Sequence, residues 1–349
     1  MIKLGNLHEP GVLAALGSAL LFGLGTPLAK QLLADLNPWL LAGLLYLGSG
    51  LGMSLYRRIS GAQPVQLPAA ERGWLAGAVL CGGVVAPVLL MLGLRGLPAS
   101  DASLLLNAEA VFTALLAWFA FRENVDRRVA FGMLAIVAGA VLLSWPARPH
   151  LSALGPALLV LAACLCWALD NNLTRKLSLS DASWIAAFKG VASGGVNVTL
   201  ALSLGAQLPT PTQLLQALLL GFVAYGLSLS LFVLALRRLG TARTGAYFSV
   251  APFFGALLAL ALGESASLRL GAAGLLMAYG VWLHLSERHE HAHHHEPMQH
   301  DHEHVHDAHH QHEHEAPVAP GTRHRHPHRH EALTHRHAHF PDAHHRHRH

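Results

Sequence analysis

The sequence predicts an all-α membrane protein of about ten transmembrane helices in two inverted five-helix repeats, followed by a disordered, histidine-rich C-terminal tail. The composition is one reason, because apolar residues make up 52% of the 349 residues and charged residues only 13%, about half the charged share of a soluble domain. The second reason is that apolar runs recur with short gaps, each about 20 residues long, which is enough to cross roughly 30 Å of hydrocarbon. So many runs cannot all be buried in a water-soluble fold of residues 1–286.

Each predicted helix corresponds to one apolar run. The first run follows Lys3 and is not closed by an A-x-A cleavage site, so we expect it to be the first helix and not a signal peptide. The ten runs lie at residues 10–29, 39–56, 74–94, 102–121, 129–145, 153–173, 183–204, 214–236, 244–262 and 270–286.

The basic residues of the connections favour one orientation of these helices, because Lys and Arg accumulate in the short cytoplasmic loops of membrane proteins. With a cytoplasmic N-terminus, twelve of them fall inside and four outside. We therefore expect a multi-pass protein of the cytoplasmic (inner) membrane with both termini in the cytoplasm. The inside group is Lys3, Arg57, Arg58, Arg72, Arg122, Arg127, Arg128, Arg175, Lys176, Arg237, Arg238 and Arg243, and the outside group is Lys30, Arg95, Arg148 and Arg269.

Two stretches of the apolar body, 89–123 and 229–264, resemble each other at an offset of 142 residues. The Ala-Leu-Leu-Ala core of the first, 114–117, falls on the same four residues of the second, 256–259. Because the offset spans five predicted helices, an odd number, the second half should enter the membrane inverted, as in many secondary transporters. A duplication without a transport role, or chance similarity between Leu/Ala-rich helices, is the alternative.

The apolar run 110–118 followed by Glu123, with its counterpart 251–259 and Glu264, resembles the EamA-type members of the drug/metabolite transporter superfamily. The resemblance covers residues 10–286 and implies a ten-helix permease that moves small organic solutes, often outward. The family pattern usually has a proline before the apolar run in both halves. This sequence keeps Pro252 but has Ala110 at the first position, which puts a first-half kink in doubt.

Ionisable residues inside predicted helices are candidates for transport and coupling, because a charge there costs about 2.5–3.5 kcal/mol on insertion scales. Glu109 lies ~11 Å into the fourth segment, where a proton-coupling carboxylate and a static hydrogen-bonded carboxyl are both open interpretations. Asp170, in the run Asp170-Asn171-Asn172, lies at a depth similar to that of Lys189 on the next segment. One hypothesis is an Asp170–Lys189 ion pair, and the alternative is that Lys189 snorkels alone to the surface.

Prolines lie inside three predicted helices, at Pro27, Pro87 and Pro252. Each lacks a backbone donor and favours a kink that leaves carbonyls free for solute or water, although a merely static bend is an equal alternative. The G-x-x-x-G spacings at 73–77 and 190–194 are typical of close helix packing.

The tail contains 24 of the 27 histidines, all between His289 and His349, and has too little apolar content to fold alone. Residues 289–322 mix histidine with Asp and Glu, whereas 323–349 mix it with Arg. Neutral imidazoles are ligands of Zn, Ni, Co and Cu ions, so the tail is predicted to bind divalent metal, with a polar, pH-responsive tail as the alternative. The candidate ligands are His302, His304, His306, His312, His314, His324, His326, His328 and His330.

These observations divide the chain into a first repeat (1–145), a second repeat (146–286) and the tail (287–349). The leading interpretation is a secondary transporter that exports a small organic metabolite or drug and carries a metal-binding tail. The alternative is transition-metal efflux or a metal-regulated permease. The sequence contains no nucleophile–base pair that would indicate an enzyme. We expect that the protein requires no cofactor. The expected partners are the lipid bilayer, a small solute and divalent metal ions, without nucleic acid, in a monomer or homodimer.

Overall fold

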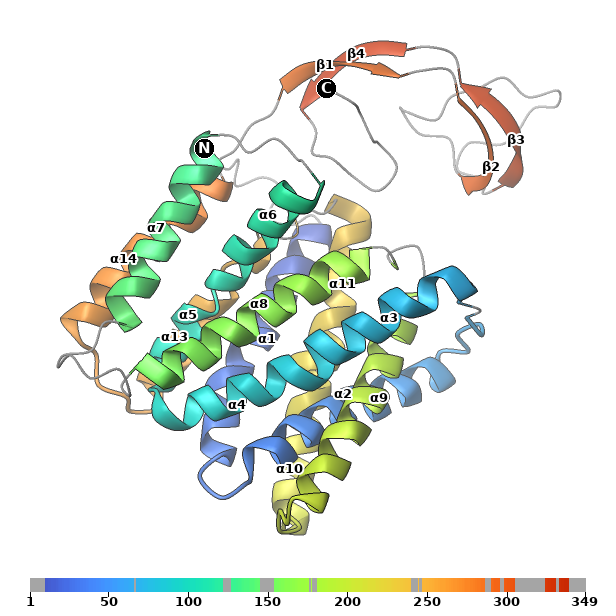
Figure 1. Cartoon of the computed structure of the whole chain (residues 1–349). Coiled ribbons are helices and arrows are strands. Elements are labelled where there is room, and N and C mark those ends of the chain that lie inside the picture. Colours follow the sequence, from blue (N-terminus) through green and yellow to red (C-terminus); the bar gives the residue numbers. More distant parts are fainter. Residues whose placement is uncertain are drawn as a thin grey trace. The chain divides into compact units, whose positions relative to one another are not determined.

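The helical body and the tail form two separate compact units, Met1–Glu287 and Arg288–His349. The computed structural model describes residues 10–65, 67–121, 127–144, 154–175, 177, 181–239, 244 and 247–285, together with four strands in the tail. Figure 1 shows the body as a bundle of roughly parallel and antiparallel helices.

Within the described body, six continuous helical stretches are long and apolar enough to cross a membrane, and three shorter apolar helices accompany them. The predicted segment 102–121 is divided into two helices by a turn at Leu106–Asn107. The described helices therefore correspond to the predicted membrane segments, which number about ten. The helices of the first half are α1 (Pro10–Leu32), α2 (Pro38–Ile59), η2 (Ala69–Glu71), α3 (Arg72–Ala78), η3 (Val79–Val85), α4 (Ala86–Gly96), α5 (Ala99–Leu105), α6 (Ala108–Phe121) and α7 (Arg127–Ser144). Those of the second half are α8 (Gly155–Arg175), α9 (Ala182–Ser203), α10 (Pro211–Gly221), η5 (Phe222–Leu227), α11 (Ser228–Leu239), α13 (Ala251–Ala261) and α14 (Leu268–Leu285).

Local sequence accounts for several helix ends. Asn37 caps α2, with Pro38 at its first position, by accepting hydrogen bonds from the backbone N–H groups of Trp39 and Leu40. Thr210 and Gln213 form a reciprocal capping box at the start of α10. The turns after α2, α9 and α13 contain Gly61, Gly205 and Gly263, which have φ angles of 64°, 84° and 103° that favour glycine.

The two halves share one succession of elements. Each has two continuous helices, then a helix containing a π-helical turn, then a helix interrupted by a short turn, then a final helix. The π-turns η3 and η5 lie at corresponding positions, Val79–Val85 and Phe222–Leu227. The interruptions also correspond, at Leu106–Asn107 and Ser249–Val250. The internal repeat seen in the sequence is thus present in the backbone.

The halves interlock through equivalent helices. The first helix of each half packs on the third and fourth of the other, α1 on α11 and α13, and α8 on α4 and α6. The helices α2 and α9 run antiparallel, because Gly43 lies against Val198 while Gly50 lies against Val191. Antiparallel packing of equivalent helices is what an inverted repeat requires.

Glycine makes the α2–α9 contact close. A methyl group built on Gly190 or Gly194 would overlap backbone atoms of α2, so the predicted 190–194 packing motif is confirmed. The 73–77 motif does not pack in this way. Among the described residues outside its own helix, none lies within 4 Å of a methyl built on Gly73, and a methyl on Gly77 meets the side chain of Leu173.

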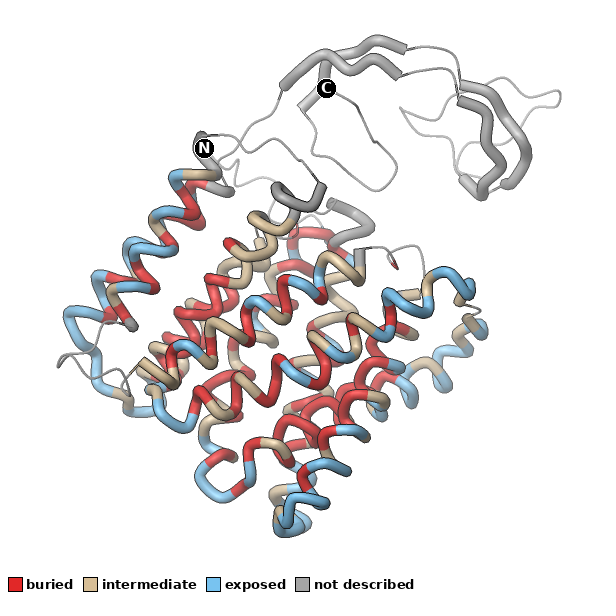
Figure 2. The backbone as a smooth tube through the Cα atoms, in the orientation of Figure 1, coloured by how far each residue is buried: buried red, intermediate tan, exposed pale blue. Residues whose placement is uncertain are grey.

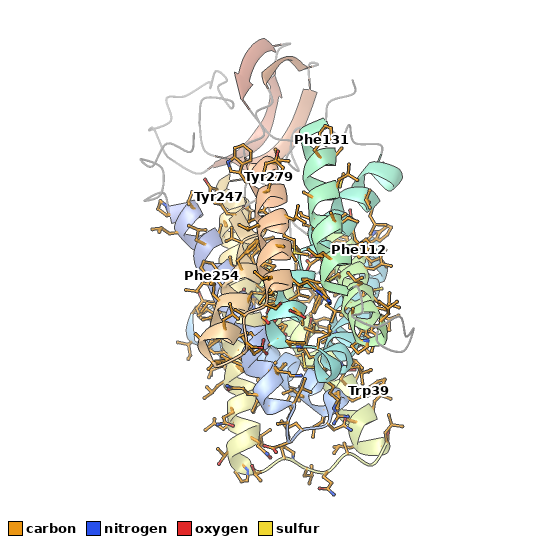
Figure 3. The ribbon with its side chains drawn as sticks, turned by 90° about the vertical axis from the view of Figure 1, so that its left-hand side faces the viewer. Trp39, Phe112, Phe131, Tyr247, Phe254 and Tyr279 are labelled. Atoms are coloured by element: carbon orange, nitrogen blue, oxygen red, sulfur yellow. The ribbon has the colours of Figure 1, made fainter. Side chains whose placement is uncertain are left out.

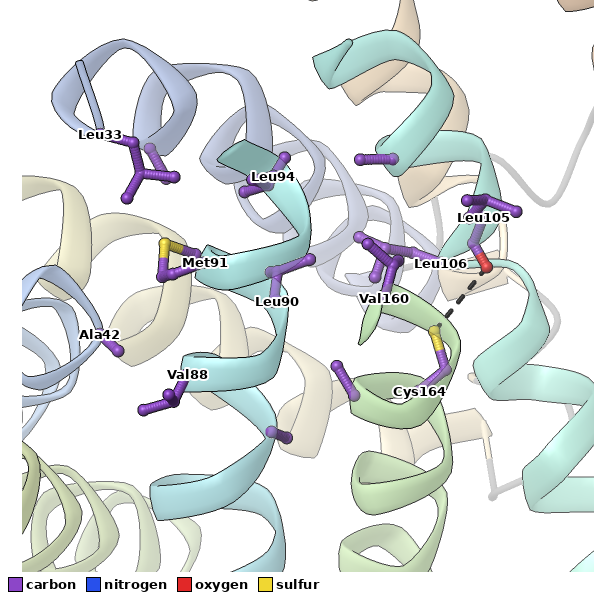
Figure 4. Packing of buried hydrophobic residues seen from close by; sticks show 14 of the residues in the cluster. Leu33, Ala42, Val88, Leu90, Met91, Leu94, Leu105, Leu106, Val160 and Cys164 are labelled. Atoms are coloured by element: carbon purple, nitrogen blue, oxygen red, sulfur yellow. Dashed lines mark hydrogen bonds between the residues drawn. The ribbon is translucent and has the colours of Figure 1, made fainter. Parts of the chain in front are cut away.

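The core lies between the helices, and apolar side chains also cover much of the outside. Figure 4 shows part of the largest buried cluster, where Leu90 and Leu94 of α4 lie near Val160 of α8. In Figure 2 the exposed residues follow the outer helix faces, and many of them are large and apolar, such as Leu134 and Leu275. In Figure 3, Trp39 lies toward one end of the body and Phe131 and Tyr279 toward the other. This distribution suits a lipid-facing surface with aromatic anchors near both interfaces.

The tail differs from the predicted disorder, because it contains four short strands. The strand β1 (Glu290–His295) pairs antiparallel with β4 (Leu333–Ala338), and β2 (Met298–His304) pairs with β3 (His324–His330). Each pair joins a strand of the acidic half to one of the arginine-containing half, as in the register of Glu303 opposite Arg325. The alternation of histidine with a period of two along β2 and β3 favours extended ribbons over a random tail.

Candidate transport site

A buried ion pair joins α8 to α9. The Lys189 Nζ lies 2.7 Å from Oδ1 and 2.5 Å from Oδ2 of Asp170, and the two residues are only 8% and 6% exposed. Thr174 donates a further hydrogen bond of 2.9 Å to Asp170 Oδ1. The structure therefore contains the Asp170–Lys189 pair and not a snorkelling lysine.

A second polar cluster starts at the next residue of α8. Asn171 Nδ2 donates to Glu109 Oε1 of α6 at 2.8 Å and lies 3.5 Å from Thr113 Oγ1. Asn171 is exposed and Glu109 is partly exposed, whereas the ion pair beside them is buried. Asn172 does not join the cluster, because its amide donates to the carbonyl of Ala168 within its own helix.

The π-turn η3 lies directly against the ion pair. A methyl group built on Gly82 would overlap the carboxylate of Asp170, so only glycine allows this approach. Pro87 follows one turn later and lacks the N–H that a regular helix would direct at a carbonyl of this turn. Carbonyl oxygens of this turn accept hydrogen bonds from side chains of the protein itself, so their use by solute or water stays a prediction.

Side chains from three other helices donate hydrogen bonds to carbonyl oxygens of this turn. Tyr46 Oη donates to Gly82 O at 2.6 Å, and Trp167 Nε1 donates to the same oxygen at 3.0 Å. Asn197 Nδ2 donates to Gly83 O and Val84 O at 3.3 and 3.2 Å. The π-turn thus links α2, α8 and α9, and π-turns in helices are frequent at functional sites.

Aromatic rings surround the same region. Phe22 contacts Trp167, Tyr225 and Phe248, with ring centroids 6.4, 5.8 and 5.4 Å apart. Tyr46 packs on Tyr225 at 5.5 Å. Because these rings come from both halves of the chain, the region lies at the contact between the two repeats.

The other two predicted prolines lie in different settings. Pro27 is inside the continuous helix α1, whereas Pro252 is in the first turn of α13, just after the interruption at Ser249–Val250. The first half is interrupted as well, although Ala110 replaces the family proline. At this interruption Asn107 Nδ2 donates a hydrogen bond of 2.9 Å to Leu104 O.

Sequence reasoning found Glu109, Asp170, Asn171 and Lys189, which the structure brings together, but it missed Tyr46 and Asn197. The available signal was the pair Gly82-Gly83 shortly before Pro87, which marks a weak point in a helix. The predicted histidine ligands in the tail lie partly on strands, and His306, His312 and His314 are outside the described residues. Among the described side chains, no group of three or more His, Cys, Asp or Glu could hold a metal ion.

Comparison with known proteins agrees with this architecture. A model of the EamA-like transporter family matches residues 9–145 and 154–286, one match to each half. The chain belongs to the EamA-like transporter family. It is therefore a multi-pass membrane protein of a transporter family.

Relatives of this EamA-like chain carry transporter names. It is 28% identical over 292 residues to an uncharacterized transporter of Methanothermobacter thermautotrophicus, a match covering 78% of this chain and 85% of the relative. It is 37% identical over 83 residues to a probable amino-acid metabolite efflux pump of Salmonella typhimurium, covering 24% of this chain and 28% of the relative. A solved crystal structure superposes with a TM-score of 0.62 at 18% identity, over 78% of this chain and 94% of the other, and supports the fold alone.

Proposed function

We propose that this EamA-like protein is a secondary transporter that exports a small organic metabolite across the cytoplasmic membrane, with Glu109 as the coupling carboxylate. The observation that carries the proposal is the partly exposed Glu109–Asn171 contact beside the buried Asp170–Lys189 pair, at the junction of the two repeats. Inverted repeats provide two similar conformations open to opposite sides. A carboxylate between them can exchange a proton or bind a cationic group of the solute in each conformation.

In this proposal the ion pair has a different role from Glu109. Both charges are buried, so removing either one leaves the other without a partner. The pair holds α8 to α9, which both belong to the second repeat, and its contact with Gly82 reaches the first repeat. We assign Asp170 and Lys189 to a lock that keeps this junction closed while Glu109 exchanges its ligand.

The proposed function can be tested with purified protein in liposomes. A panel of amino acids and related metabolites is first screened for compounds that raise the melting temperature, because a ligand that binds the folded state stabilises it. Uptake of a compound found in this way is then measured with and without a pH gradient. We expect Glu109→Gln to abolish the response to the gradient, whereas Asp35→Asn, an exposed carboxylate in the α1–α2 turn, should retain it. Unchanged proton dependence in Glu109→Gln would refute the role of Glu109.

A second candidate function involves metal ions, and the observation that favours it is the register of the tail. In the β2–β3 ribbon, His300, His302 and His304 lie opposite His328, His326 and His324. Residues directly opposite, and those two apart along a strand, share one face of a ribbon. We propose that this face binds Zn²⁺, Ni²⁺, Co²⁺ or Cu²⁺ and makes the protein a metal-regulated permease, with metal efflux as the alternative.

One experiment, with the full chain and a variant ending at Glu287, distinguishes metal regulation from metal efflux. Zn²⁺ binding is measured by calorimetry, and Zn²⁺ and organic-solute transport are measured in liposomes. Regulation predicts that Zn²⁺ changes solute transport only in the full chain and does not cross the membrane. Zn²⁺ transport by the variant without the tail would instead support metal efflux. Absence of Zn²⁺ binding by the full chain would contradict both hypotheses.

A further inference from the structure

A carboxylate of the second repeat binds the start of a helix of the first. Glu264, in the turn after α13, accepts hydrogen bonds from the backbone N–H groups of Ala99 and Ser100, the first residues of α5. The distances are 2.6 Å from Ala99 N to Oε1 and 2.9 Å from Ser100 N to Oε2. Each carboxylate oxygen thus satisfies one N–H that has no partner within the helix.

The end of α13 positions this carboxylate. Gly263 N donates to Leu260 O and Glu264 N donates to Ala259 O, which is the hydrogen-bond pattern of a Schellman motif. Gly263 has a φ of 103°, a left-handed conformation that residues with a Cβ adopt at a cost. The Gly263-Glu264 sequence therefore ends one helix and directs a carboxylate at another.

A lysine holds the residues just before α5. Lys30, near the end of α1, donates to the carbonyl oxygens of Leu94 and Leu97, the latter at 2.9 Å. Lys30 therefore binds carbonyl groups just before the start of α5, and Glu264 binds the backbone N–H groups at its start. Burial raises the pKa of Glu264, but hydrogen bonds from Ser100 and Ala99 and the charge of Lys30 outweigh it and lower the pKa. The carboxylate is thus charged at neutral pH.

The helix α5, whose start Glu264 binds, is short and is separated from both α4 and α6. The seven residues of α5 lie between Pro98 and the turn at Leu106–Asn107, after which α6 carries Glu109. Six of the seven residues of α5 are buried, and the helix packs against α1 and α7 of the first repeat and α8, α13 and α14 of the second. Ser103 Oγ and Asn107 Oδ1 are buried and have no hydrogen-bond partner within the part of the chain that the structure describes. Lys30 and Glu264 therefore supply the polar contacts that tie the start of α5 and the connection before it to neighbouring elements.

We propose that Lys30 and Glu264 are gating residues that close one end of the transport pathway by holding α5 between the repeats. This inference rests on the proposed transport function, since it requires an end that opens. Opening that end requires the hydrogen bonds from Ala99 and Ser100 to Glu264 to break, and α5 then moves as a unit about Pro98 and the Leu106–Asn107 turn. In the proposed orientation this is the outer end.

The proposal is tested by labelling two positions on either side of Glu109, without any transported solute. Single cysteines at Ser103→Cys, on α5, and Thr113→Cys, beside Asn171, are introduced into full-length protein lacking the native cysteines and placed in nanodiscs. The labelling rate with a soluble maleimide is compared with and without Glu264→Gln. We expect labelling at position 103 to rise about fivefold or more, in the range of typical coupling energies, and labelling at position 113 to fall.

The opposite signs distinguish a gate from a structural contact. Asp35→Asn, which removes an exposed carboxylate at the same end of α1, is the matched control and should change neither rate. Equal rates with and without Glu264→Gln in folded protein would overturn the proposal, and so would a rise at both positions, which indicates general loosening. If Glu264→Gln does not fold, Lys30→Gln replaces it and must give the same reciprocal change. Because no solute is used, failure here is distinguishable from failure of the coupling role of Glu109.

Discussion

Among individual side chains, the buried Asp170–Lys189 ion pair should make the largest electrostatic contribution to the free energy of unfolding. Removing one partner of a buried pair typically costs about 3–5 kcal/mol, because the remaining charge is left uncompensated. We expect Asp170→Asn and Lys189→Met each to destabilise the protein by an amount of this order, and the double variant to lose clearly less than the sum. Unfolding free energies in detergent, arranged as a double-mutant cycle, measure the coupling. Strictly additive losses would show that the two side chains act independently.

The partly exposed pair between Arg57 and Asp181 provides a contrast at the same scale. Asp181 caps α9, and its Oδ2 lies 2.9 Å from Arg57 Nη1, but its side chain is 39% exposed. Burial raises the pKa of Asp181, yet hydrogen bonds from Ser183 and Arg57 and the charge of Arg57 outweigh it and lower the pKa to about 2. Because the unfolded pKa is about 3.9, the resulting stabilisation is fully present above that pH and is lost as the pH falls toward 2.

The pH dependence of this pair can be measured directly. Asp181→Asn keeps a capping side chain but loses the charge. We expect the parent to melt slightly higher than Asp181→Asn at pH 6, and the difference to shrink as the pH falls from 4 to 2. The effect should be small, since the Asp181 side chain is 39% exposed and ion pairs in contact with water contribute about 0–1 kcal/mol. A difference in melting temperature that stays constant over this range would contradict the assignment.

At the scale of elements, two neighbouring glycines of α9 should respond with opposite signs. A methyl group on Gly194 would lie 2.5 Å from Leu47 N and 2.8 Å from Gly43 O, so α2 and α9 would have to separate. No atom of another described element lies within 4 Å of a methyl on Gly195. We expect Gly194→Ala to destabilise by about 1–3 kcal/mol through overpacking, and Gly195→Ala to stabilise by roughly 0.5–1 kcal/mol. Equal effects on the melting temperature would mean that α2 and α9 do not pack this closely.

The elements also show where sequence reasoning stops. Length and apolarity were sufficient to place the helices within a few residues, because membrane thickness sets their length. The π-turn at Val79–Val85 was not foreseen, since its carbonyls depend on Tyr46, Trp167 and Asn197 from other helices. The lack of a proline at Ala110 puts a first-half kink in doubt, yet the helix is interrupted at Leu106–Asn107, where the Asn107 side chain donates to Leu104 O. Both features depend on particular side-chain contacts that helix periodicity does not reveal.

At the scale of the whole molecule, the repeat explains why the candidate site could be approached from sequence at all. Charge is rare in the body, so Glu109, Asp170 and Lys189 stood out, and the order of the helices made Asp170 and Lys189 neighbours. Lys30 and Glu264 were not recognised as a pair, because their joint contact with the α4–α5 connection depends on how the repeats interlock. The sequence pattern therefore did not predict which residues of one repeat contact the other.

Orientation in the membrane decides what each end of the molecule does. With a cytoplasmic N-terminus, the α1–α2 and α13–α14 turns face outward after one and nine crossings, whereas the turn after α2 faces the cytoplasm. Asp35→Cys and Ser265→Cys should therefore react with a membrane-impermeant maleimide in intact cells, and Ser60→Cys only after permeabilisation; all three positions are exposed. The reverse pattern would place Lys30 and Glu264 at a cytoplasmic gate and the histidine-rich tail outside the cell. Different sidedness of positions 35 and 265 would instead refute the five-helix repeat, because only an even number of crossings between them returns both to one side.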